Sequence, residues 1–62
     1  MCLATIYRDT DNSVLMENTA HIRIKDNRVE LQDLFGSCKS LEGCVTNIDL
    51  ENNTVTIHCE SK

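Results

Sequence analysis

The sequence predicts an all-β protein, built as a small antiparallel β-barrel or rolled sheet of six or seven short strands. Apolar and polar residues alternate with a period of two along most of the chain, and sustained helical periodicity is nearly absent. Turn-forming residues separate the alternating segments at regular intervals, and no proline interrupts them. Residues 1–62 suffice for a single domain. Such a pattern is typical of SH3-like and OB-like barrels, and strand spacing does not distinguish the two.

The first two expected strands are residues 2–7 and 14–17. In the first, Cys2, Ala4 and Ile6 share one face. Residues 9–12 read Asp-Thr-Asp-Asn, and such side chains hydrogen-bond their own backbone and favour a turn.

The clearest hairpin is HIRIKDNRVELQ, residues 21–32. Ile22 and Ile24 alternate with polar neighbours and are expected to point inward, as are Val29 and Leu31 on the returning strand. Residues 26–27, Asp-Asn, tolerate the left-handed conformations of a tight hairpin turn.

The second half of the chain continues this pattern. Gly36 indicates a turn or bulge after Leu34 and Phe35. A short strand is expected at residues 38–41, a turn at residues 42–43 and a strand at residues 44–50. After a turn at residues 52–53, residues 54–59 form the last expected strand, with Val55, Ile57 and Cys59 on one face.

Charge argues against nucleic acid as the partner. Six basic residues face ten acidic ones, for a net charge of −4, whereas contacts from Lys and Arg to phosphate supply most non-specific affinity. Only Tyr7 and Phe35 are aromatic, which leaves little to stack on bases. An RNA-binding barrel remains an alternative if the cations gather on one face: Arg8, Arg23, Lys25, Arg28 and Lys39. A metal-free protein-interaction module is a second alternative.

The amino-terminal residues lack the apolar run of a signal peptide, and no segment approaches the ~20 apolar residues of a membrane span. We therefore expect a cytoplasmic protein whose four cysteines are reduced.

Cys2 is the candidate metal ligand. Methionine removal tolerates a residue as small as cysteine, so the mature chain would begin at Cys2. Its α-amine and thiolate together close a five-membered chelate ring on a metal. Nitrogen and sulfur donors in a plane suit Ni(II) or Cu(II), whereas a closed tetrahedral set suits Zn(II). The alternative is a small buried cysteine at the start of an edge strand.

The other thiols and the histidines carry no recognisable pattern. Cys38, Cys44 and Cys59 form no CxxC motif, and core positions are the commoner interpretation, although they could pair or bind a second metal with a histidine. His21 and His58 fall on faces expected to point outward, where most histidines are solvated and some ligate metals. No catalytic constellation is present, so an enzyme is not expected.

Four segments carry a resemblance to a known family: MCLAT, VLMEN, VELQDLFG and LEGCVTNIDLENNTV. They resemble the CooT family of short nickel-binding accessory proteins associated with maturation of carbon monoxide dehydrogenase. The opening MCLA is shared with the hydrogenase-maturation chaperone HypC family, whereas DLFG and the length favour CooT. The resemblance covers nearly the whole chain.

That resemblance implies a homodimeric β protein in which the cysteine after the initiator methionine, here Cys2, binds Ni(II). The expected function is that of a nickel metallochaperone or nickel store. Its expected client is carbon monoxide dehydrogenase or the proteins that mature it.

Overall fold

The computed structural model describes residues 3–59, which contain five β-strands and no helix. The strands are β1 (Ala4–Arg8), β2 (Val14–Lys25), β3 (Arg28–Asp33), β4 (Cys38–Asp49) and β5 (Thr54–Cys59). The all-β class is confirmed, and the predicted number of six or seven strands is wrong. Residues 3–59 offer no helix of the length and apolarity that a membrane crossing needs.

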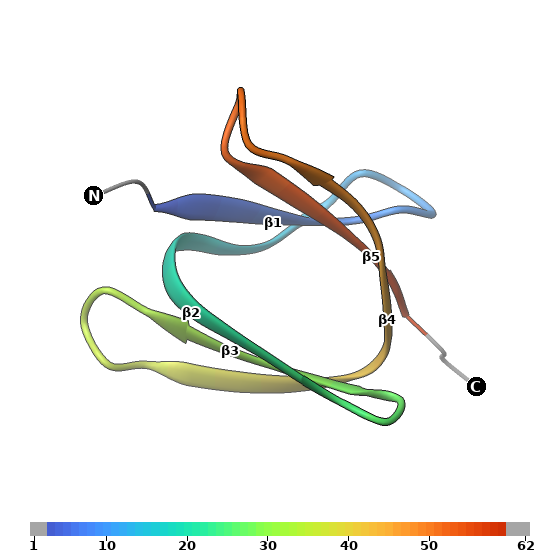
Figure 1. Cartoon of the computed structure of the whole chain (residues 1–62), viewed down its shortest axis with the longest axis horizontal. Helices are drawn as coiled ribbons and strands as arrows, with labels where there is room; N and C mark the ends of the chain where they lie inside the picture. The colour runs from blue at the N-terminus through green and yellow to red at the C-terminus, as the bar shows by residue number, and fades with distance from the viewer. Residues whose placement is uncertain (1–2, 60–62) are drawn as a thin grey trace.

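The five strands form one sheet that closes on itself (Figure 1). Each strand pairs antiparallel with the next one in the chain, and β1 also pairs with β5. This closing pair is parallel, because the direction alternates at each of the four turns and the first and fifth strands therefore run the same way. Since every spatial neighbour except that pair is consecutive in sequence, the order differs from the Greek-key order of an OB-like barrel.

The strand number is smaller than predicted because β2 and β4 are each twelve residues long. In β2, two segments that were expected to be separate are continuous across Asn18 and Thr19. Asn18 has a φ of 56°, and the register with both neighbouring strands shifts beside Thr19. The first part of β2 pairs with β1 and the second with β3, so this irregularity bends one strand between two partners.

The prediction of a turn at residues 42–43 is wrong, because β4 continues through Gly43 without interruption. Before Gly43 the strand pairs with β3, and from Gly43 onward it pairs with β5. Gly43 has a φ of 155°, and a Cβ atom there would collide with the backbone oxygen of His58 and lie 3.0 Å from the Cα of Cys59. The glycine therefore serves a close backbone approach rather than a turn.

Five side chains, from β1, β3 and β5, form the buried core: Ile6, Val29, Leu31, Val55 and Ile57. The inward predictions for Val29 and Leu31 are thus confirmed. Ile22 and Ile24 share the face of Leu31 and Val29, yet they are 37% and 57% exposed. They lie past the end of the β1–β2 pairing, in the part of β2 that pairs only with β3. At roughly 1.5–3 kcal/mol per buried side chain, this is a small core.

Candidate metal centre

Cys2 lies outside the described residues, and the described residues that follow it in the chain begin β1. Ala4 pairs with Thr19 of β2, and Thr5 pairs with Thr54 of β5. The Thr5 backbone N–H also donates to the carbonyl oxygen of Asn53 at 3.0 Å. The first residues of β1 are therefore fixed on both sides by backbone pairing.

The turn between β3 and β4 lies on the same side of the molecule as the start of β1 (Figure 1). It is joined to the bend of β2, because the Leu34 N–H donates to the carbonyl oxygen of Asn18 at 2.9 Å. Within it, Asp33 Oδ1 accepts hydrogen bonds from the N–H groups of Phe35, at 3.0 Å, and Ser37, at 2.9 Å. Gly36 has a φ of 91°, which confirms the predicted turn. The DLFG segment is thus a hydrogen-bonded turn beside the start of β1.

Large apolar side chains are exposed on two turns, β3–β4 and β4–β5, which lie apart in Figure 1. Leu34 is 53% and Phe35 is 78% exposed on the β3–β4 turn. Leu50 is 81% exposed on the β4–β5 turn, which ends at the Asn53 carbonyl bonded to Thr5. We call these three residues the apolar rim. They lie on two separate turns, and contact with a partner chain would remove their side chains from water.

The three cysteines of the described chain are free thiols, and two of them are not core residues. Cys38 and Cys44 are exposed on β4, so the core interpretation is wrong for both. They occupy one strand and do not face each other across a hairpin. Cys59 is partly buried against the core, as its alternation with Ile57 predicted.

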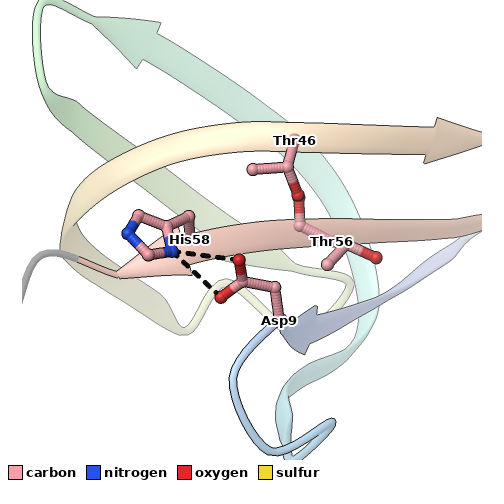
Figure 2. Close-up of polar contacts among 4 residues, drawn as sticks. All are labelled: Asp9, Thr46, Thr56 and His58. Carbon is pink, nitrogen blue, oxygen red and sulfur yellow. Dashed lines mark hydrogen bonds and ion pairs between the residues drawn. The ribbon is translucent and has the colours of Figure 1, made fainter.

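Both histidines point outward, as predicted, and only His58 has a fixed polar partner within residues 3–59. Its Nδ1 lies 2.9 Å from Oδ2 and 3.2 Å from Oδ1 of Asp9, which directly follows β1 (Figure 2). An ionised carboxylate only accepts hydrogen bonds, so Nδ1 carries a proton, and in the neutral ring Nε2 then holds the free lone pair. The sequence held no signal for Asp9, because its contact depends on the parallel pairing of β1 with β5.

Among the residues that the structure describes, no three side chains of His, Cys, Asp or Glu converge to hold a metal ion. The predicted ligand, Cys2, lies outside that range. The cations do not gather on one face either: Arg23, Lys25 and Arg28 share an outer surface with Glu30 and Glu42. Lys39 instead donates to the carbonyl of Leu15 at 3.3 Å, and Arg8 lies 3.9 Å from Asp11. The condition for an RNA-binding face is therefore not met.

Comparison with known proteins gives one positive result. The family model of the CO dehydrogenase accessory protein CooT matches residues 1–58, which include nearly all of the five-stranded sheet. No match to a curated protein was found. The matched range spans the MCLAT opening, the DLFG turn and both long strands. The chain therefore belongs to the family of the CO dehydrogenase accessory protein CooT.

Proposed function

We propose that this chain is a nickel-binding accessory protein for maturation of carbon monoxide dehydrogenase, acting as a metallochaperone or nickel store. Membership of the accessory-protein family is the observation that carries the proposal, since the matched range begins with Met1 and Cys2. Nickel is the cargo in this role. The proposal adds to the family's accessory role a metal, a ligand and an assembly.

Cys2 is the proposed ligand because it offers two donors in one residue. After removal of Met1, its α-amine and thiolate form an N,S chelate of the kind that Ni(II) accepts in a square plane. One Cys2 does not fill that plane, whereas two copies meeting at a twofold axis supply four donors. The proposed site is therefore shared by two chains.

Exposed apolar side chains and a small core support a homodimer. Leu34 and Phe35 of the apolar rim are exposed on a turn bonded to the bend of β2, and Leu50 is exposed on a turn that ends at the Asn53 carbonyl bonded to Thr5. A core of five side chains is small for an independent domain, and oligomerisation is one of the usual supplements in this size range. A shared metal would add to the stability of the paired state.

The decisive experiment is a nickel titration under reducing conditions, read by native mass spectrometry and sedimentation. The intact chain is expected to lose Met1 and to bind one Ni(II) tightly per dimer. Cys2→Ser should abolish this tight binding, because it removes the thiolate while leaving the amine. The matched control is Cys38→Ser, which removes an exposed thiol from β4 and should leave the tight site intact.

An N-terminally extended variant tests the amine. Adding residues ahead of Cys2 converts its amine to an amide and should weaken binding even though the thiol remains. Tight binding that survives Cys2→Ser would contradict the Cys2 site. One tightly bound ion that depends on Cys2 yet is held by a monomeric chain would contradict sharing between two chains.

A further inference from the structure

Beside the end of β1, Cys44 and His58 face each other on the adjacent strands β4 and β5. They are directly paired in the antiparallel β4–β5 ladder, so their Cβ atoms are neighbours at roughly 4.5–5.5 Å. Both side chains are exposed, while their strand neighbours Val45 and Ile57 turn toward the core. A free thiol and an imidazole therefore project from the same outer surface.

His58 is already oriented for a ligand on its free nitrogen. Nδ1 is bonded to Asp9, and Figure 2 shows the second ring nitrogen directed away from that carboxylate. Asp9 is itself held in place, because its backbone N–H donates to the carbonyl of Ile57 at 3.0 Å. A histidine whose outer N–H is bonded to a carboxylate is the usual arrangement of a metal-ligating imidazole.

Hydrogen bonds hold the strands around this pair in place. Thr46, the next outward residue of β4, donates through Oγ1 to the carbonyl oxygen of Thr56 at 3.2 Å (Figure 2). On the other side, the Gly43 N–H donates to the carbonyl oxygen of Asn27 at 2.7 Å. The backbone that carries Cys44 is thus bonded on both sides, which keeps its side chain opposite His58.

We propose that Cys44 Sγ and His58 Nε2 form a second metal site for a divalent ion such as Zn(II), Co(II) or Ni(II), oriented by Asp9. One thiolate and one imidazole are the donors that such ions share. Because no third such side chain converges there within residues 3–59, water fills the remaining positions and the ion exchanges readily. This site is separate from the nickel site proposed at Cys2 and does not depend on it.

The chain contains a natural comparison for this pair. Cys38 is equally free and exposed on β4, but its cross-strand partner is Gln32 rather than a histidine. His21 pairs with the same Gln32 from the other side, so a whole strand separates it from Cys38, about 10 Å. One thiolate and one imidazole cannot share an ion at that spacing. Cys38 and His21 therefore serve as matched controls.

Cobalt is the probe, because a thiolate bound to Co(II) gives a charge-transfer absorption in the near ultraviolet. The titration uses the full chain carrying Cys2→Ser, in a phosphine reductant, so that the terminal site does not contribute. One Co(II) per chain with a thiolate band is expected, and Zn(II) should displace it. Adding Cys44→Ser should remove the band.

Two further variants distinguish the metal ligand, His58, from the residue that orients it, Asp9. His58→Gln should weaken Co(II) binding more than Asp9→Asn, for which about a tenfold loss is expected because only the orienting carboxylate changes. Far-UV circular dichroism on each variant checks that the sheet is intact. Cys38→Ser and His21→Gln should leave the titration unchanged.

The proposal is overturned if the Cys2→Ser chain shows no thiolate band, or if Cys38→Ser removes the band while Cys44→Ser does not. If Cys2→Ser by itself abolishes binding, and the other substitutions made singly in the wild-type chain have no effect, the terminal site is upheld and this one is refuted.

Discussion

The two long strands, β2 and β4, both change pairing partner partway along, and a different residue makes each change possible. Each is twelve residues long, and each gives its first part to one neighbour and its second part to another. β2 changes partner at Asn18, which adopts a positive φ that asparagine tolerates. β4 changes partner at Gly43, where the backbone of β5 leaves no room for any side chain. The change of partner in β2 depends on the backbone conformation of Asn18, and the change in β4 depends on the space beside Gly43.

The difference matters because each bend supports a different proposed site. The β2 bend offers its Asn18 carbonyl to Leu34 and so anchors the DLFG turn beside the start of β1. The β4 bend brings the strand against β5 and places Cys44 opposite His58. A substitution at either bend therefore tests the fold and its neighbouring site together.

The largest effect is expected from Gly43→Ala. The new methyl group would overlap the His58 carbonyl oxygen, and overpacking against backbone costs about 3 kcal/mol or more. A chain of this size has only about 5 kcal/mol of stability in total. We expect the variant to be largely unfolded, as measured by far-UV circular dichroism and by urea titration.

Gly36→Ala is the matched control for that variant. Gly36 also has a positive φ, of 91°, but no atom lies within 4 Å of the position of its Cβ. Alanine there should cost about 1–2 kcal/mol through backbone strain alone. Equal losses at the two glycines would show that space at Gly43 is not the limiting factor.

A smaller effect is expected at the β2 bend. Asn18→Ala places a residue without a compensating side chain at a φ of 56°, and about 1 kcal/mol of destabilisation should result. Asn18→Gly relaxes the same strain and should change the urea midpoint little. If alanine and glycine behave alike, the positive φ is not what holds this bend.

The smallest effect concerns the turns that flank the long strands. The Asn52 side chain and backbone donate to Asp49 after β4 and lower its pKa below 3.8. The Ser13 hydroxyl and N–H donate to Asp11 before β2 and lower its pKa similarly. Because both pKa values are lower in the folded chain, these carboxylates stabilise it above about pH 4, and that contribution is lost as pH falls through the folded values.

The measurement is the urea midpoint between pH 5 and pH 2.5 for the wild type, Asp49→Asn and Asp11→Asn. Each variant should be less stable than the wild type at pH 5 and should lose less on acidification. Parallel pH curves for all three proteins would show that neither turn contributes.

The hairpin HIRIKDNRVELQ could be predicted almost completely from the sequence, including its turn and the pairing of Ile24 with Val29. Alternation specifies which residues share a face, and Asp26 takes the expected positive φ of 53°. Alternation does not reveal which part of a face is covered, so the exposure of Ile22 and Ile24 could not be foreseen. Nor does it separate a glycine that ends a strand from one that lets another strand approach, as at Gly43.

Of the candidate sites, one could be predicted from the sequence and the other could not. Cys2 is identified by its position in the chain and its chemistry, neither of which requires a fold. The contact between Asp9 and His58 requires knowing that β1 and β5 lie side by side. No local pattern encodes such a contact, because it depends on how the whole sheet closes.

The parallel pairing of β1 with β5 also bears on how the chain folds. Pairing Thr5 with Thr54 joins residues from distant parts of the sequence, whereas each antiparallel pair closes only a short loop. Loop-closure entropy makes such distant contacts slow to form, and topologies rich in them fold slowly. During synthesis, β1 cannot pair with β5 until β5 has left the ribosome. The strand that follows Cys2 in the chain therefore gains its second neighbour last.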